Sequence, residues 1–290
     1  MKIQTVSIVV GSSACNAKCP FCVAKMTSQT QHLESVQVHW RNFGIACKCA
    51  EKGEVTTVLL TGQGEPTLSP ELIFEYLRRI KVMEQHGIVN FPFKELQTNG
   101  ILLMGDKLDK DMREWYNLGL TTIAISAVHW EQDKNQEVYG EKYPNLPKLI
   151  QKLHAFGFSV RLSVMLLKGY IDTPNSVMKL AKVCKDNKVE QLTVRPINTP
   201  NNGSGDIYDW TKSHTIDFDV MIQIAKKIAM HGDSILELPH GATIYDLDGQ
   251  NICLSNCLTT NKSIEDMRQI IFFPNGRIAY DWCYEGATML

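Results

Sequence analysis

Three of the chain's nine cysteines lie within eight residues near its start. Cys15, Cys19 and Cys22 are spaced C-x3-C-x2-C in the segment GSSACNAKCPFCVAKM, residues 11–26. Thiolates bind zinc ions or iron–sulfur clusters. A structural zinc site usually takes four protein ligands, and this segment supplies three thiols and no histidine. A four-iron cluster held by three thiolates would leave one iron free for another ligand. The alternative is a metal or redox loop that a distant residue completes.

A second set of cysteines, Cys253, Cys257 and Cys283, lies near the end of the chain. Between the last two, IIFFPNGRIAYDW (270–282) has two β-type runs around Asn275-Gly276. This pattern predicts a β-hairpin with a type I′ turn. A hairpin brings its two ends together, so Cys283 could return to the earlier pair. The alternatives for this set are a zinc site or thiols that are simply buried or free.

The remaining cysteines favour packing over chemistry. Cys47 and Cys49 lie two positions apart on a predicted helix and therefore face different directions, which favours core or boundary packing. Cys184 lies on the apolar face of another predicted helix, so we expect it in the core.

Short β-type runs alternate with longer helical ones along the first two thirds of the chain. Predicted strands cover residues 6–10, 56–62, 93–100, 121–126, 159–167 and 190–197, and predicted helices cover 35–53, 69–87, 106–118, a segment ending near 157, and 173–187. Six βα units in series imply a parallel sheet with right-handed crossovers. The fold class is therefore α/β, a (βα)6 partial TIM barrel, since a full barrel would need two more units.

The pattern changes after the sixth strand. We expect a loop at 198–210, one more helix at 216–231, and then the hairpin. This predicts a barrel domain over residues 1–231 and a small C-terminal hairpin module over residues 232–290.

Charge and hydropathy limit the partners. The net charge of −1 over 290 residues gives no global field for nucleic acid, so nucleic-acid binding is not expected. The first ten residues alternate like a strand and do not resemble a signal peptide. No apolar run approaches the roughly 18 residues of a membrane helix. We expect a cytoplasmic protein that does not associate with membranes.

The cysteine spacing after the first strand of such a barrel resembles that of the radical S-adenosylmethionine (radical SAM) enzymes, and the resemblance covers roughly residues 5–200. TGQGEP (61–66), at the end of the second predicted strand, is similar to the GGEP segment of that family. There, the backbone and the glutamate hold the methionyl amino group of the cofactor. The resemblance gives this role to Gly62, Gly64 and Glu65, followed by Pro66, whereas Gln63 replaces the first glycine of the usual pair.

Further positions that the resemblance assigns to the cofactor also lie at strand ends, where ligand sites of parallel α/β sheets are found. They are Phe21 (beside adenine), Thr98 and Asn99 of LQTNG (beneath the cofactor), Ser126 (ribose and carboxylate) and Arg161 (carboxylate). Arg195 is expected at the barrel mouth, in contact with the cofactor or an anionic substrate group, or in a structural ion pair. His129 and Trp130 could line the substrate cavity or simply pack. Each residue alone would be unremarkable, and their joint order carries the resemblance.

The resemblance implies a [4Fe–4S] cluster held by Cys15, Cys19 and Cys22, with S-adenosylmethionine on the fourth iron. Reductive cleavage would yield a 5′-deoxyadenosyl radical that takes a hydrogen atom from the substrate, with a flavodoxin- or ferredoxin-type electron donor. The charge and the lack of an appended recognition domain favour a small-molecule substrate over a macromolecule. No acid–base device stands out, although Tyr280 and Tyr284 flank Cys283 and could relay a hydrogen atom.

The order Cys, Cys, hairpin, Cys resembles the auxiliary-cluster extension of molybdopterin-precursor-synthase-like members of the family. It implies a second [4Fe–4S] cluster on Cys253, Cys257 and Cys283. The chain ends in EGATML without the Gly-Arg-Arg tail of those members, so the resemblance does not extend to substrate. Alternatives are a single-cluster activase, an RNA- or peptide-modifying enzyme, or a non-catalytic iron–sulfur or zinc protein. TGQGEP and Arg161 argue against the last of these.

Overall fold

The computed structural model describes residues 1–26, 37–199, 204–238, 241–255, 266–282 and 285–290. Its strands are β1 (Ile3–Val9), β2 (Thr57–Thr61), β3 (Phe93–Thr98), β4 (Thr122–Ala127), β5 (Ser159–Leu166), β6 (Gln191–Pro196), β7 (Asp233–Glu237), β8 (Thr243–Leu247), β9 (Gln250–Leu254), β10 (Met267–Phe272) and β11 (Ile278–Ala279). Its α-helices are α1 (Val23–Met26), α2 (Trp40–Lys52), α3 (Pro70–Gln85), α4 (Asp109–Asn117), α5 (Gln132–Tyr139), α6 (Leu146–Ala155), α7 (Pro174–Asp186), α8 (Asp206–His214) and α9 (Phe218–His231). Short 3-10 helices are η1 (Pro66–Leu68), η2 (Ile101–Leu103), η3 (Asp106–Leu108) and η4 (Glu285–Ala287).

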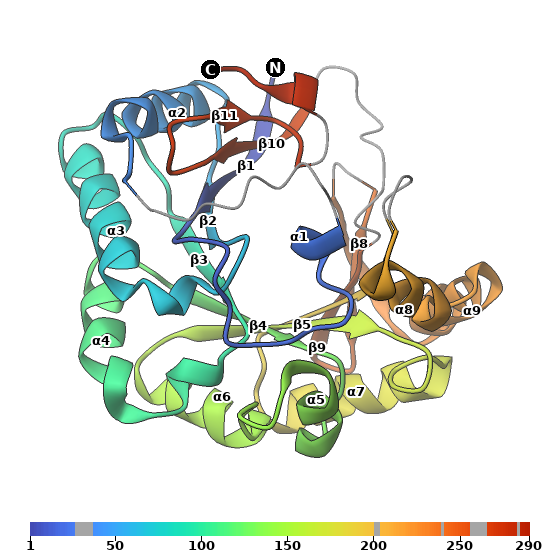
Figure 1. Ribbon diagram of the computed structural model, residues 1–290. Helices are drawn as coiled ribbons and strands as arrows, with labels where there is room; N and C mark the ends of the chain where they lie inside the picture. The colour runs from blue at the N-terminus through green and yellow to red at the C-terminus, as the bar shows by residue number, and fades with distance from the viewer. Residues whose placement is uncertain (27–36, 200–203, 239–240, 256–265, 283–284) are drawn as a thin grey trace.

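The strands form one sheet in the order β11-β10-β1-β2-β3-β4-β5-β6-β9-β8-β7. Strands β1 to β6 are parallel neighbours in chain order, as predicted. The sheet curves around a central space without closing, and the helices cover its outside (Figure 1). This arrangement confirms the (βα)6 partial barrel.

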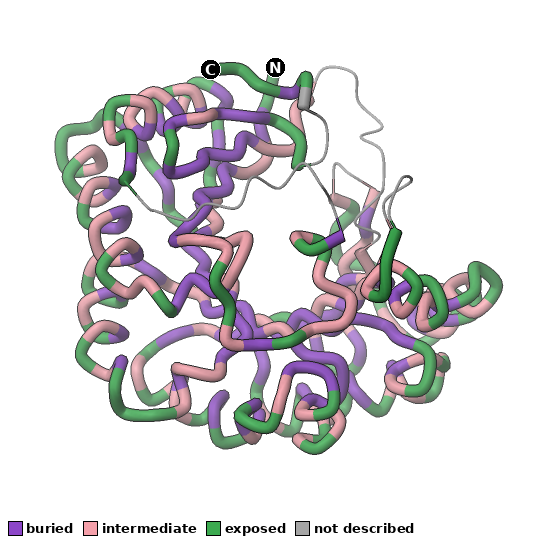
Figure 2. The backbone as a smooth tube through the Cα atoms, in the orientation of Figure 1, coloured by how far each residue is buried: buried purple, intermediate pink, exposed green. Residues whose placement is uncertain are grey.

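Alternation along the strands separates two faces of the sheet. Side chains such as Leu96, Ile123 and Leu162 are buried in the large apolar core against the helices, whereas their strand neighbours point to the inner face. Figure 2 shows the strands as mostly buried and the outer turns of the helices as exposed. Cys47 and Cys184 are buried in this core, as expected, and burial raises the pKa of Cys184 to about 12.

Two predictions about helices were wrong in detail. Part of the predicted loop at 198–210 belongs to α8, whose ends suit the helix dipole: Asp206 and Asp209 lie in its first turn, and Lys212 in its last. The single helix expected before Gly157 is two helices. Gly140 ends α5 with a φ of 115°, and the side chain of Asn145 caps α6 by accepting from the backbone N–H of Lys148.

The C-terminal strands extend both edges of the barrel sheet. Strand β9 pairs in parallel with β6 and continues the sheet into an antiparallel β9-β8-β7 run. Strand β10 pairs in parallel with β1, so that the two ends of the chain lie close together in Figure 1. Aromatic contacts anchor β10, since the ring of Phe272 packs 5.4 Å from that of Phe43 in α2. The domain boundary near residue 232 stays a prediction.

The predicted hairpin forms between β10 and β11, but its turn type differs from the prediction. The N–H of Gly276 donates to the carbonyl of Phe273 (2.9 Å), which places Pro274 and Asn275 at the two central positions. A type I′ turn needs positive φ at both, and the proline ring fixes φ near −65°. Only Gly276, with φ of 92°, takes the left-handed conformation in this turn.

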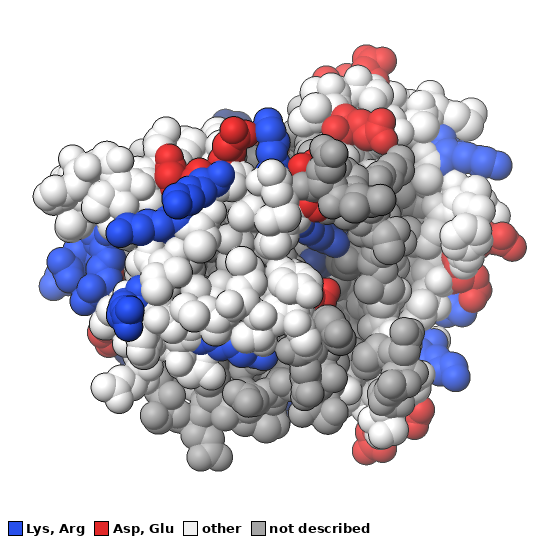
Figure 3. Space-filling view, turned by 90° about the horizontal axis from the view of Figure 1, so that it is seen from above, with Lys and Arg blue, Asp and Glu red and all other residues white. Residues whose placement is uncertain are grey.

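Basic and acidic side chains are interspersed on the face shown in Figure 3. None of the helices in the described ranges is long and apolar enough to cross a bilayer.

Candidate functional site

The cysteine loop, residues 11–22, follows β1 and crosses the mouth of the barrel (Figure 1). Gly11 opens it with φ of 75°, and a β-carbon there would lie 2.8 Å from Oγ of Ser69. Cys15 is exposed, while Cys19 and Cys22 are half-buried. The backbone N–H of Ala17 donates to Sγ of Cys15 (3.4 Å), a contact typical of a loop that wraps around thiolates.

The three thiols act on one another electrostatically. Burial, and to a smaller extent negative charge on Cys22 and Cys15, raise the pKa of Cys19 to about 12. Three thiolates in this loop therefore need positive charge among them, which bound iron would supply. Among the described residues no three His, Cys, Asp or Glu side chains converge on one ion. A [4Fe–4S] cluster does not require that, because each thiolate binds a different iron.

The GQGEP segment lies directly against the cysteine loop. A β-carbon on Gly64 would lie 2.0 Å from the carbonyl oxygen of Ala14, so only glycine permits this approach. The N–H of Glu65 donates to the same carbonyl (2.9 Å). Gly62 is less tightly enclosed, since its β-carbon would lie 3.2 Å from the carbonyl oxygen of Val10. Both glycines are therefore explained by close backbone packing at the loop.

Glu65 is buried, with 4% of its surface exposed, and its carboxylate accepts four hydrogen bonds. Two come from Thr67, through its N–H (3.0 Å) and its hydroxyl (2.7 Å). The other two come from the hydroxyl of Thr98 (2.6 Å) and the N–H of Asn99 (2.9 Å). Burial raises the pKa of Glu65, and the hydrogen bonds from Asn99, Thr98 and Thr67 oppose this rise. The carboxylate thus joins the loops after β2 and β3.

Asn99 extends this network to the cysteine loop. Its Nδ2 donates to Oδ1 of Asn16 (2.7 Å), and its Oδ1 accepts from the N–H of Ile101 (3.0 Å). Two atoms beside these loops, Nδ2 of Asn16 and Oε1 of Gln63, are buried without a hydrogen-bond partner. Orphaned polar atoms of this kind call for an explanation, and a polar cofactor bound at the loops would supply one.

A cluster of aromatic side chains packs against the cysteine loop through Phe21, with Tyr139 and Tyr143 buried. The ring of Phe21 lies 6.2 Å from those of Tyr139 and Trp210, and Tyr139 stacks on Tyr143 at 4.9 Å. We call Phe21, Tyr139, Tyr143 and Trp210 the aromatic collar. The hydroxyl of Tyr143 donates to the carbonyl of Ser126 (2.8 Å), which ties the collar to the end of β4.

The two arginines predicted to lie at the site, Arg195 and Arg161, lie at different depths in the barrel. Arg195, near the end of β6, donates from Nε to Sδ of Met165 (3.3 Å). Burial raises the pKa of Tyr139 and the positive charge of Arg195 opposes this rise, so Arg195 lies close to the collar. Arg161 lies near the start of β5, and its guanidinium pairs with Glu95 of β3 (2.5 Å). The predicted contact of Arg161 with the cofactor stays a prediction.

Only part of the second cysteine set can be placed. Cys253 is buried in β9, in register with Thr193 of β6. Cys257, Cys283 and Tyr284 lie outside the described residues, so the auxiliary cluster stays a prediction. Tyr280 is exposed after β11.

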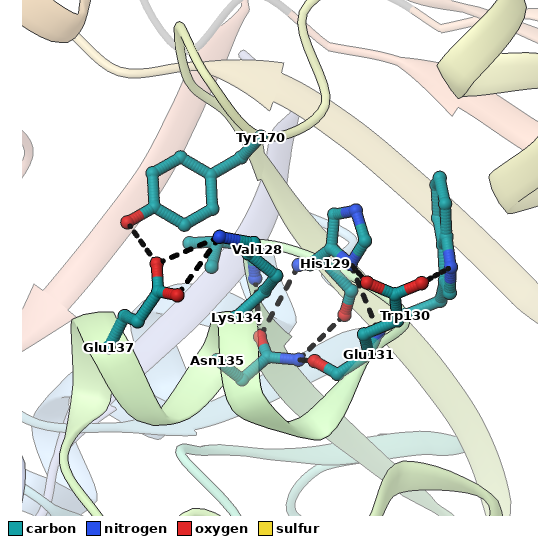
Figure 4. A network of polar contacts seen from close by, with 8 residues as sticks. All are labelled: Val128, His129, Trp130, Glu131, Lys134, Asn135, Glu137 and Tyr170. Carbon is teal, nitrogen blue, oxygen red and sulfur yellow. Dashed lines mark hydrogen bonds and ion pairs between the residues drawn. The ribbon is translucent and has the colours of Figure 1, made fainter.

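His129 and Trp130 belong to a polar network at the start of α5 (Figure 4). Their ring centroids lie 4.0 Å apart with the planes tilted by 32°. Trp130 borders an apolar gap with Leu146 and Leu180 of the outer helices. Packing therefore accounts for Trp130.

Sequence reasoning missed several residues of the mouth and its surroundings, namely Asn16, Glu95, Tyr139, Tyr143 and Trp210. A period-two pattern in FKELQT could have revealed Glu95 and Gln97 as inner-face residues of β3. Apart from Phe21, the collar residues come from α5, α8 and the loop after α5, and no local pattern links these three to the cysteines.

Solved structures with similar folds include radical SAM proteins. The structure of anSMEcpe with bound AdoMet is 14% identical, with a TM-score of 0.65; the match covers 100% of this chain and 74% of that one. SuiB of Streptococcus suis, bound to S-adenosylmethionine, is 14% identical with a TM-score of 0.61, and the match covers 96% of this chain and 60% of SuiB. Methylornithine synthase (PylB) is 12% identical with a TM-score of 0.53, with 78% and 62% covered.

At these identities the likeness shows the fold, and this chain spans 60% of the length of SuiB. No curated protein matches the chain. The family model described as Radical SAM superfamily matches residues 9–184, more than half of the chain, from the cysteine loop to α7. The chain belongs to the radical SAM superfamily.

Proposed function

We propose that this chain cleaves S-adenosylmethionine reductively and uses the resulting 5′-deoxyadenosyl radical to take a hydrogen atom from a substrate in the barrel. A [4Fe–4S] cluster on Cys15, Cys19 and Cys22 would supply the electron that breaks the C5′–S bond. One observation carries the proposal. The carboxylate of Glu65, in the GQGEP segment, accepts hydrogen bonds from the TNG segment. The backbone N–H of Glu65 donates to the carbonyl of Ala14 in the cysteine loop.

The chain's own residues would bind and orient the cofactor. S-adenosylmethionine carries an ammonium, a sulfonium, a carboxylate and adenine. The buried carboxylate of Glu65 lends negative potential to a site for the two cations, while its direct contact with the ammonium stays a prediction. The unsatisfied Oε1 of Gln63 and Nδ2 of Asn16 suit the ammonium and the carboxylate respectively.

The aromatic collar suits the rest of the cofactor. Phe21, packed between Tyr139 and Trp210, offers an apolar wall for adenine, as the sequence predicts for Phe21. Ser126, whose carbonyl is held by Tyr143, lies at the end of β4 for the ribose or carboxylate. The cysteine loop and the aromatic collar together would keep water from the C5′–S bond.

The proposal also covers the class of substrate. The weak net charge favours a small molecule. A peptide is the second candidate, because structures similar to this one include SuiB bound to its precursor peptide SuiA and anSMEcpe with bound Cp18Cys peptide. We further propose a flavodoxin- or ferredoxin-type protein as electron donor.

Anaerobic reconstitution with iron and sulfide, followed by dithionite and S-adenosylmethionine, tests the main proposal. Wild type should form 5′-deoxyadenosine. Single changes of Cys15, Cys19 or Cys22 to Ala should abolish it, because the loop has no spare thiolate. Cys49→Ala is a matched control, since Cys49 is half-buried in α2, outside the loop. A single loop variant that kept the wild-type rate would refute the proposal.

We also propose that Cys253, Cys257 and Cys283 hold a second [4Fe–4S] cluster. The reconstituted chain should then hold about eight irons, and the triple Ala variant about four. Equal iron content in both would show that no second cluster exists.

A further inference from the structure

A polar group lies on the inner face of the sheet, away from the cysteine loop. Strand register places Ala124 of β4 beside Gln97 of β3 on one side and Arg161 of β5 on the other. Their chain neighbours Leu96, Ile123 and Leu162 pack against the helices, so Gln97, Ala124 and Arg161 face the barrel interior.

An ion pair bridges this face. Nη2 of Arg161 contacts Oε1 of Glu95 (2.5 Å), and Nε2 of Gln97 donates to the same oxygen (3.0 Å). Glu95 in β3 and Arg161 in β5 are separated by β4, where the small side chain of Ala124 leaves room for the guanidinium to pass. Both charged side chains are largely buried, with 21% of Arg161 and 11% of Glu95 exposed.

This pair lies well below the mouth of the barrel. Arg161 precedes Met165 by four residues, a distance of about 13 Å along β5. Met165 is the register partner of Arg195, which lies beside the collar. The head group of Arg161 also turns sideways to Glu95 rather than towards the cysteine loop. The two arginines therefore serve different levels of the barrel.

The pair keeps an unused donor. Nε of Arg161 is buried without a hydrogen-bond partner. Because Glu95 balances the charge, the guanidinium can remain buried and still donate to an oxygen that enters the barrel. Cys253 of β9 lies within electrostatic range: burial raises the pKa of its thiol, and the charge of Arg161 opposes this rise.

We infer that the Glu95–Arg161 pair is the floor of the substrate site, where Arg161 donates to a carboxylate or amide oxygen of the substrate. Glu95 and Gln97 hold the guanidinium in place. The family resemblance implies that Arg161 binds the cofactor carboxylate; this inference instead gives that role to Arg195. The inference rests on the proposed function, because it places the substrate below the cofactor in the same barrel.

The first experiment separates the two arginines. Removing only one charge of the pair would leave the other buried and unpaired, so the test variant is the double change Glu95→Gln with Arg161→Gln. Titration calorimetry of cluster-loaded protein should give an affinity for S-adenosylmethionine within about twofold of wild type. Arg195→Gln should weaken the affinity at least tenfold. A tenfold loss in the double variant would overturn the inference.

The second experiment tests the floor itself with two probes, N-acetylglycine for a carboxylate and N-acetylglycinamide for an amide. Saturation-transfer NMR on wild type should detect binding of at least one, and the double variant should lose it. The probe that binds identifies the substrate group, carboxylate or amide, that Arg161 recognises. Absence of binding for both, or binding that survives in the double variant, overturns the inference. Failure of wild type to form 5′-deoxyadenosine would instead refute the proposed function.

Discussion

Two buried side chains, Glu65 and Asn135, hold loops at the mouth of the barrel in place. Glu65 holds the loops after β2 and β3, and Asn135 holds the loop after β4 (Figure 4). Both residues are nearly or fully buried, and both make four hydrogen bonds. They therefore do the same structural task with different chemistry.

The difference is charge. Asn135 accepts from the N–H groups of Val128 (2.9 Å) and His129 (3.3 Å), and donates to the carbonyls of His129 (2.7 Å) and Glu131 (2.9 Å). A neutral amide therefore pairs with two N–H groups and two carbonyls of this loop. Glu65 only accepts, and burial of its carboxylate carries a desolvation cost that is seen as a raised pKa.

A neutral amide would be the less costly way to hold a loop, so the buried carboxylate needs another reason. The charge of Glu65 also raises the pKa of Cys15, although burial has the larger effect. Glu65 therefore adds negative charge beside the cysteine loop. Negative charge at this place suits a cofactor that carries an ammonium and a sulfonium. The contacts described for the loop after β4 are ring packing and hydrogen bonds within the protein.

The largest expected effect in this comparison is that of Glu65→Gln. The amide keeps one acceptor and places an NH2 against donors, so the free energy of unfolding should fall by about 2–4 kcal/mol. The affinity for S-adenosylmethionine should also fall at least tenfold, because the negative charge is lost. Urea unfolding and calorimetry on cluster-loaded protein measure the two effects. An unchanged cofactor affinity would mean that Glu65 serves structure only.

Asn135→Asp makes the converse change in the other loop. The carboxylate keeps the acceptor role but removes the side-chain donor from the carbonyls of His129 and Glu131. The carbonyl of Glu131 keeps its hydrogen bond from the backbone N–H of position 135 (3.3 Å), so the carbonyl of His129 loses more. We expect unfolding free energy to fall by about 1–3 kcal/mol. Cofactor affinity, measured by the same calorimetry, should stay within about twofold of wild type. If it fell as far as in Glu65→Gln, the two loops would not differ in the way argued above.

Local patterns explain what could be predicted from the sequence. Strands β1 to β6 alternate with helices, and each strand carries an apolar run that only the core can bury. The cysteine loop and GQGEP were recognisable because their spacing is local. The close approach of Gly64 to Ala14 gives a physical reason for that glycine.

Contacts between residues far apart in the sequence explain what could not be predicted. Glu65 meets Thr98 across 33 residues, and the depth of Arg161 depends on the pairing of β4 with β5. The sequence placed Arg161 on the right strand but could not show that Glu95 takes its head group. Strands β7 to β9 were missed, since the exposed β7 lacks an apolar face of its own.

The smallest expected effect concerns pH and the loop that Asn135 holds. His129 is buried, its Nδ1 accepts from the N–H of Glu131 (3.1 Å), and its ring packs at a tilt against that of Trp130. Burial lowers the pKa of His129; Glu131 and Asp133 oppose this, while Lys134 and Lys179 add to it. The neutral ring is the form that fits the loop, because protonation at Nδ1 would remove the acceptor.

The sign follows from the lowered pKa. The unfolded chain binds a proton at His129 below about pH 6.5, while the folded chain does not until its lower pKa is reached. Stability from this group is therefore fully present above about pH 6.5 and falls as the pH drops towards the folded-state value. His129→Asn offers an acceptor to Glu131 and cannot titrate, so it should show a smaller loss of unfolding free energy between pH 7.5 and 5.5. The exposed His86, changed to Asn, is the control and should keep the wild-type loss. Equal pH dependence in His129→Asn and wild type would show that protonation of this ring does not weaken the loop.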